Sequence, residues 1–245
     1  MPIAKDFFAL VAGAGPGTGR SIALRFAKLY PTVLLARRRE NFDGIVNEIE
    51  AAGGTALGIT ADVSDPAAVQ AAFATIKKEM PNSKLAAAVY NVNGGFAMKP
   101  FLDLKAEDLE SSLDGTVRAG FTYAQHCLPL LLDAVSQAPH PPSLIFTGAT
   151  ASLKASAQFA SFAAGKFALR ALTQSLAREF GPRGVHVAHV IIDGLIDTPR
   201  ARGFAGKDQV MISPDAIAES YWYLHTQDKS AFTQELDLRP HSEKF

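Results

Sequence analysis

The sequence predicts a doubly wound α/β fold, in which helices cover both faces of a parallel sheet of about seven strands. Two observations carry this prediction. Short apolar runs alternate with longer segments of helical periodicity along the chain. The first apolar run also passes directly into a glycine-rich turn and a helix. The chain has 245 residues and shows no linker or internal repeat, so we expect one domain over residues 1–245.

The predicted strands are short, nearly continuous apolar runs, as expected of strands that are buried on both faces. In chain order they are Phe7–Ala14, Thr32–Ala36, Thr55–Thr60, Leu85–Val92, Ser143–Ala149, Val185–Ile192 and Glu235–Leu238.

The predicted helices are bounded by capping and helix-breaking residues such as Pro66, Gly53 and Gly181. They cover Ser21–Tyr30, Asn41–Ala52, Pro66–Glu79, Ala106–Val135, Gln158–Phe180 and Pro214–Thr226. The long helix that ends at Val135 contains Pro129, where we expect a bend.

Composition excludes several classes of protein. Lys and Arg number 24 and Asp and Glu number 24, so the net charge of 0 does not suggest a nucleic-acid binder. No apolar run approaches the ~18 residues of a membrane helix. Cys127 is the single cysteine, which excludes an intrachain disulfide and a cysteine metal site. We expect a cytoplasmic protein without a metal.

A glycine-rich turn links the first strand to the first helix through Gly13, Gly15, Gly17, Thr18 and Gly19. Glycines permit a tight turn and a close approach of the backbone to a diphosphate, and a helix N-terminus favours negative charge. The order strand, turn, helix and second strand is the context that a dinucleotide site requires. A mobile surface turn is the alternative.

The spacing Gly13-x-x-x-Gly17-x-Gly19 resembles that of the short-chain dehydrogenase/reductase family, which has a Rossmann fold. The resemblance extends from Ala9 to about Leu224. It implies further cofactor-binding residues in three later segments. These are Asp62 and Val63, then Asn91, then Gly194, Ile196 and Thr198.

The residues at the end of the second predicted strand favour NADP(H) over NAD(H). An acidic residue there binds the ribose 2′-hydroxyl of NAD. In this sequence Ala36 occupies the position of that acidic residue, and Arg37 follows it. The guanidinium of an arginine can bind a phosphate group through two hydrogen bonds. Glu40 is an alternative ligand of the ribose. Alternatively, the three arginines at 37–39 are simply solvated at the start of the next helix.

The catalytic motif of the family, Tyr-x-x-x-Lys, corresponds to Phe162-Ala163-Ala164-Gly165-Lys166. The resemblance implies that Lys166 binds the cofactor ribose, whereas Phe162 has no proton to donate. The serine of the family corresponds to Ala149, and its asparagine to Thr116. Thr150 is a candidate hydrogen-bond donor in place of the serine.

Two functions remain open from the sequence. The first is an NADP(H)-dependent oxidoreductase with an altered active site, and the second is a non-catalytic NADP(H)-binding sensor or partner subunit. The first predicts a small-molecule substrate covered by the loop Leu195–Ser213. The family resemblance also implies a homodimer or homotetramer. Tyr90 could approach the cleft, but an aromatic strand residue of this kind is expected in the core.

Overall fold

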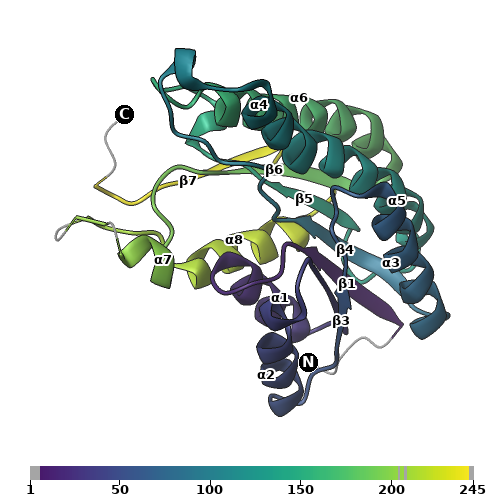
Figure 1. The fold of residues 1–245 in the computed structure, drawn as a ribbon. Helices are drawn as coiled ribbons and strands as arrows, with labels where there is room; N and C mark the ends of the chain where they lie inside the picture. The colour runs from purple at the N-terminus through teal and green to yellow at the C-terminus, as the bar shows by residue number, and fades with distance from the viewer. Residues whose placement is uncertain (1–5, 204, 207–208, 243–245) are drawn as a thin grey trace.

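Seven parallel strands form one sheet in the order β3-β2-β1-β4-β5-β6-β7 (Figure 1). This computed structural model describes residues 6–203, 205–206 and 209–242. The strands are β1 (Phe7–Ala12), β2 (Thr32–Ala36), β3 (Ala56–Thr60), β4 (Lys84–Tyr90), β5 (Ser143–Thr147), β6 (His186–Ile192) and β7 (Glu235–Leu238). From β1 the strand order runs through β2 to β3 at one edge, and from β4 it runs through β5 and β6 to β7 at the other edge. The order therefore reverses between β1 and β4, which is the switch point of the sheet. In open α/β sheets, ligands bind at the carboxyl ends of the strands at such a point.

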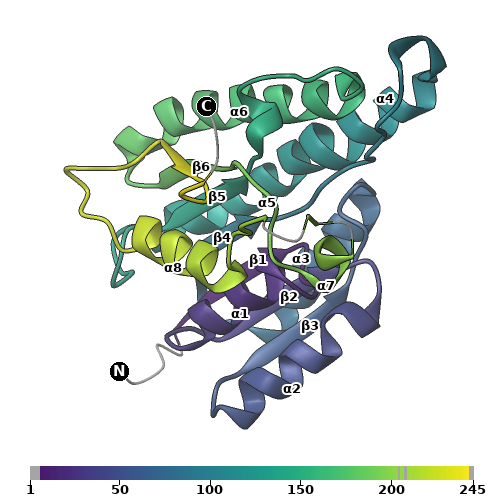
Figure 2. The same cartoon turned by 90° about the vertical axis from the view of Figure 1, so that its left-hand side faces the viewer.

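Helices cover both faces of the sheet, which confirms the predicted fold class (Figures 1 and 2). One face carries α1 (Thr18–Ala27), α2 (Asp43–Ala51) and α8 (Pro214–His225). The opposite face carries α3 (Pro66–Glu79), α5 (Ala119–Ala134) and α6 (Ala160–Phe180). The shorter helices are α4 (Ala106–Leu113) and α7 (Pro199–Arg202).

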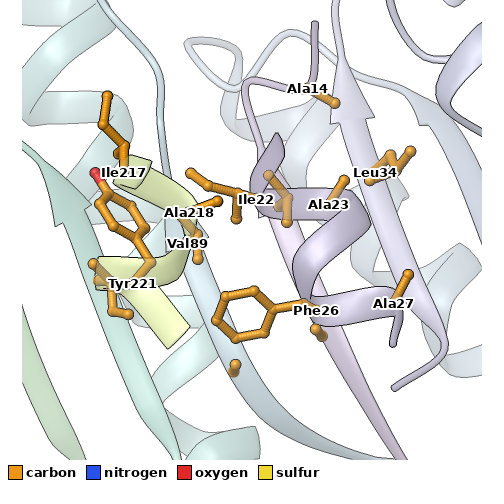
Figure 3. Packing of buried hydrophobic residues seen from close by; sticks show 14 of the residues in the cluster. Ala14, Ile22, Ala23, Phe26, Ala27, Leu34, Val89, Ile217, Ala218 and Tyr221 are labelled. Carbon is orange, nitrogen blue, oxygen red and sulfur yellow. The ribbon is translucent and has the colours of Figure 1, made fainter. Parts of the chain in front are cut away.

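Each face buries its own apolar cluster. On the first face, Phe26 of α1 and Tyr221 of α8 pack above the sheet beside Val89 of β4 (Figure 3). On the other face, Tyr90 and Tyr123 are fully buried and their ring centroids are 5.4 Å apart. Tyr90 is therefore a core residue, as its strand position predicts.

Two strands end earlier than the apolar runs predict. β1 ends at Ala12 because the N–H groups of Gly13 and Ala14 both donate to the Leu35 carbonyl, which turns the chain. β5 ends at Thr147, where Gly148 begins the turn into a short 3-10 helix.

The long predicted helix is interrupted at Asp114–Arg118 by a π turn rather than at Pro129, which lies inside α5. The turn packs closely against another segment of the chain. A Cβ atom on Gly115 would lie 2.6 Å from the Cα atom of Gly94. Thr116, inside the π turn, accepts a hydrogen bond of 3.0 Å from the N–H of Gly94. π turns of this kind are frequent at functional sites.

Over the described residues, none of the helices has both the length and the hydropathy needed to cross a membrane.

Candidate functional site

The turn between β1 and α1 requires glycine at three positions. Gly13 and Gly17 have φ angles of +84° and +110°, which other residues rarely adopt. A Cβ atom added to Gly13 would lie 2.4 Å from the Asn91 carbonyl oxygen. A Cβ atom added to Gly19 would lie 2.4 Å from the Gly13 carbonyl oxygen. At Gly17 it would lie 2.8 Å from the methyl carbon of Thr198. Side chains at these three positions would therefore clash with the protein itself, whereas Gly15 has open space around it.

The first turn of α1 follows the glycine turn directly. Gly17 is the N-cap residue and offers no side-chain cap, and no acidic side chain occupies the first turn. Thr18 begins the helix and is buried. The N–H groups and the positive end of the helix dipole therefore favour an anion such as a diphosphate.

A cleft of about 670 Å³ opens beside the glycine turn. It joins the ends of four strands and is lined by Gly13, Arg37, Asp62, Val63 and Asn91, all predicted as cofactor residues. The opposite wall comes from α4 and the π turn, through residues that sequence reasoning missed. These are Glu107, Glu110, Ser111 and Asp114. The sequence gives no local signal for them, because only the packing of α4 brings them to the cleft.

Arg37 and Asp62 interact inside the cleft. Arg37 follows β2 and its side chain is exposed there. Burial acts to raise the pKa of Asp62, but hydrogen bonds from the hydroxyl and N–H of Ser64 and the charge of Arg37 outweigh it. The pKa of Asp62 is therefore held below its usual value, and the carboxylate is ionised at neutral pH.

A chain of hydrogen bonds fixes Asn91 between the glycine turn and β5. Its Nδ2 donates to the Gly13 carbonyl oxygen over 3.3 Å, and its Oδ1 accepts from the Thr147 hydroxyl over 3.0 Å. The Thr147 hydroxyl also lies 2.7 Å from that of Tyr221 on α8. Because Tyr221 is far along the chain, its part in this network was not predicted from the sequence.

Lys166 is buried on α6 and directed toward the end of β5. Its Nζ donates to the Thr147 carbonyl oxygen over 3.1 Å and lies 5.9 Å from the centroid of the Phe162 ring. Burial lowers the pKa of Lys166 to about 8. The ammonium therefore stays mostly protonated at pH 7, and Lys166 brings a positive charge to the strand ends that also position Asn91.

The Thr150 hydroxyl contacts a buried carboxylate. It donates to the carboxylate of Asp193, which follows β6 and is buried. Asp193 is paired in turn with Arg239, whose Nη2 lies 3.2 Å from Asp193 Oδ2. The Thr150 hydroxyl thus has Asp193 as its partner in this arrangement, and its role as a donor in place of the serine stays a prediction.

The segment after β6 folds back over the glycine turn. Gly194 is tightly packed, since a Cβ atom there would lie 2.7 Å from Pro240 Cδ. Ile196 forms a bridge with Ile212, and the Thr198 hydroxyl caps α7 by accepting from the N–H of Ala201. The Thr198 methyl group lies above Gly17. Of this predicted segment, the structure therefore brings Thr198 to the glycine turn.

His189 lies deep beneath α6 and is fully buried. Among the described residues neither ring nitrogen has a hydrogen-bond partner, although Glu235 Oε1 is 3.7 Å from Nδ1. Burial lowers the pKa of His189 to about 4, so the ring is neutral at pH 7. Over the ranges that the structure describes, no three His, Cys, Asp or Glu side chains cluster as a metal site.

Comparisons with known proteins agree with this geometry. The family model described as short chain dehydrogenase matches residues 8–208. A short-chain dehydrogenase/reductase of Armillaria gallica is 33% identical over 221 residues, which cover 89% of this chain and 80% of that protein. An uncharacterized oxidoreductase of Staphylococcus aureus (strain N315) is 25% identical over 98% of this chain and its own full length.

Solved structures give the same result. A short-chain dehydrogenase from Rhodopseudomonas palustris has a TM-score of 0.81 and 32% identity, covering 96% of this chain and 99% of that one. A Burkholderia cenocepacia short chain dehydrogenase in complex with NADP has a TM-score of 0.81 and 26% identity. The match covers 95% of this chain and 96% of that one. The family match spans most of the chain, and the chain therefore belongs to the short-chain dehydrogenase family.

Proposed function

We propose that this protein is an NADP(H)-dependent oxidoreductase in which Phe162 stands in place of the catalytic tyrosine of its family. The observation that carries the choice of cofactor is Arg37, which lines the cleft directly beside the glycine turn. An arginine here pairs with a ribose 2′-phosphate, which the acidic residue of an NAD site would repel. The Burkholderia relative that was solved with NADP supports the same choice.

The residues of the cleft fit a nicotinamide dinucleotide. The open space around Gly15 would let a diphosphate approach the backbone of the glycine turn, and the start of α1 would supply N–H groups to it. Lys166, whose Nζ donates to the Thr147 carbonyl oxygen at the end of β5, would hold a ribose hydroxyl, as the family motif implies. When bound, the nicotinamide supplies or accepts a hydride. The protein would bind and orient the reactants.

The proton step distinguishes this site from others of the family. The Phe162 ring cannot donate a proton, Ala149 has no hydroxyl, and the Thr150 hydroxyl is committed to Asp193. The Thr116 hydroxyl accepts from Gly94 within the π turn. We therefore expect weak reduction of simple ketones. This loss of donors is also what favours the second candidate, a non-catalytic NADP(H)-binding sensor or partner subunit.

The cofactor proposal predicts that NADPH binds at least about 10-fold more tightly than NADH, a difference of about 1.4 kcal/mol. The Arg37→Ala variant should lose that preference, because the charge beside the 2′-phosphate is gone. Isothermal titration calorimetry of both cofactors measures it. Arg38→Ala is the matched control, since Arg38 is also exposed and adjacent in sequence but is not among the residues that line the cleft. Equal affinities in the wild type, or an unchanged ratio in Arg37→Ala, would refute the proposal.

A further inference from the structure

We infer that Tyr221 on α8 is a positioning residue of the cofactor cleft, which acts through Thr147 and Asn91 on the glycine turn. This inference rests on the proposed function and deepens it, because it assigns a determinant of cofactor affinity to a distant helix. Tyr221 is fully buried and is not among the described residues that line the cleft, whereas Asn91 lines it. Any effect of Tyr221 on a bound cofactor is therefore indirect.

The hydrogen bonds that join these groups run in one direction. The Gly13 carbonyl oxygen can only accept, so the Asn91 atom that lies 3.3 Å from it is Nδ2. Asn91 Oδ1 therefore faces Thr147 and accepts its single hydroxyl proton over 3.0 Å. Because that proton is committed, Tyr221 must donate across the 2.7 Å that separate its hydroxyl from that of Thr147. Burial raises the pKa of Tyr221, which keeps the phenol protonated at neutral pH.

The phenol proton thereby fixes the orientation of the Asn91 amide. While Tyr221 donates to Thr147 Oγ1, the hydroxyl proton of Thr147 is directed to Asn91 Oδ1. Without the phenol, the Thr147 hydroxyl is free to rotate, and the amide loses the donor that distinguishes its oxygen from its nitrogen. A rotated amide would place Oδ1 against the Gly13 carbonyl oxygen. Two acceptors would then meet without a proton between them, which is costly in a part-buried position.

The Gly13 carbonyl group connects this amide to α1. A Cβ atom on Gly19, in the first turn of α1, would lie 2.4 Å from the Gly13 carbonyl oxygen, so the helix packs directly on it. The N–H of Gly13 donates to the Leu35 carbonyl oxygen over 3.0 Å, which ties the same residue to β2. Repulsion between Asn91 and the Gly13 carbonyl group would therefore displace the turn and the start of α1, where the diphosphate is expected.

Apolar and polar contacts hold α8 in place independently of the phenol group. The Tyr221 ring packs in the apolar cluster that contains Val89 of β4 (Figure 3). At the start of α8, the carboxylate of Asp215 accepts from the hydroxyl of Ser21 on α1 over 2.6 Å. These contacts remain when phenylalanine replaces Tyr221. The Tyr221→Phe variant therefore removes the phenol proton while keeping the ring.

The test measures NADPH binding to the full chain by calorimetry. Tyr221→Phe and Thr147→Val are each expected to weaken binding about 5- to 10-fold, as for the loss of one buried hydrogen bond. The double variant should bind no more weakly than Thr147→Val, because Tyr221 acts through that hydroxyl. Thr147→Ser keeps the hydroxyl and should restore most of the affinity. NADH binding should weaken by the same factor in Tyr221→Phe, since both cofactors contain the diphosphate.

Tyr30→Phe is the matched control. Tyr30 is also fully buried, and its hydroxyl lies 2.9 Å from Nε2 of His225 on the same helix α8. Thermal unfolding should show a similar loss of stability in both variants, whereas only Tyr221→Phe should lose cofactor affinity. An equal loss of affinity in Tyr30→Phe would show that α8 acts through stability alone. That result, unchanged affinity in Tyr221→Phe, or an additive loss in the double variant would overturn the inference.

NMR of the cofactor-free protein follows the amide itself. The side-chain N–H signals of Asn91 are identified by their absence in Asn91→Asp. We expect these protons to exchange with solvent at least about 10-fold faster in Tyr221→Phe than in the wild type or Tyr30→Phe. Unchanged exchange would overturn the inference. If NADPH binds the wild type and Tyr221→Phe changes neither affinity nor exchange, the inference fails while the proposed function stands. If the wild type binds no NADPH, the proposed function fails and the exchange rates still decide the inference.

Discussion

The double variant Ala149→Ser with Phe162→Tyr is expected to reduce small ketones with NADPH, whereas the wild type gives a near-blank rate. The Phe162 ring already lies 5.9 Å from Lys166 Nζ, so a phenol there would feel the lysine charge. That charge lowers the phenol pKa from about 10 and makes the phenol a better acid. The serine hydroxyl would supply the second donor to the developing oxyanion.

The size of the gain follows from the groups restored. A general acid contributes about 10²–10⁴ in rate and an oxyanion donor about 10²–10³. These factors do not multiply simply, because the groups act together. We therefore expect each single variant to gain little and the pair to gain at least about 100-fold. NADPH consumption with a panel of ketones measures the rates.

The matched control for this experiment is Ala149→Ser with Phe167→Tyr. Phe167 is the next phenylalanine on α6 but its side chain is 40% exposed, whereas Phe162 packs on Phe96. A phenol at position 167 should give no gain. High wild-type activity that persists in Phe162→Ala would show that the proton comes from another group, and it would also exclude the non-catalytic alternative.

Gly17→Val should abolish NADPH binding while leaving a folded protein. Gly17 has a φ of +110°, and a Cβ atom there would lie 2.8 Å from the Thr198 methyl carbon. Valine would force the turn to rearrange, which moves the N–H groups at the start of α1 away from the diphosphate position. The backbone strain costs about 1–3 kcal/mol, which a folded domain can tolerate.

Calorimetry and thermal unfolding together measure the outcome for Gly17→Val. We expect at least about 100-fold weaker NADPH binding, a difference of about 2.7 kcal/mol. Gly44→Val is the control, since Gly44 lies in α2 with open space around it. Normal NADPH affinity in a well-folded Gly17→Val protein would remove the glycine turn from the cofactor site.

Local patterns in the sequence predicted most of the fold. The apolar run that contains β1, followed by the glycines, predicted the first strand and the turn after it. Asp65 and Pro66 predicted the start of α3. The Asp65 carboxylate indeed accepts from the N–H of Ala67 over 2.9 Å. The π turn at Asp114–Arg118 left no such pattern, because it depends on the contact of Thr116 and Gly115 with Gly94.

The candidate site was predictable to the same extent. Strand ends and the family motif predicted Arg37, Asn91 and Lys166, since these depend on position along one strand or helix. The partners of Asn91 and Thr150 were not predictable, because Tyr221 and Asp193 approach them from distant elements. The same is true of the Phe96 ring, which meets Phe162 only after its loop is anchored to Gln158.

The most direct measurement is a crystal structure of the wild-type protein with NADP⁺. We expect the diphosphate at the N–H groups that begin α1, the 2′-phosphate within hydrogen-bonding distance of the Arg37 guanidinium, and the nicotinamide beside Phe162 and Lys166. A cofactor bound outside this cleft, or a 2′-phosphate directed away from Arg37, would contradict the proposed NADP(H) site.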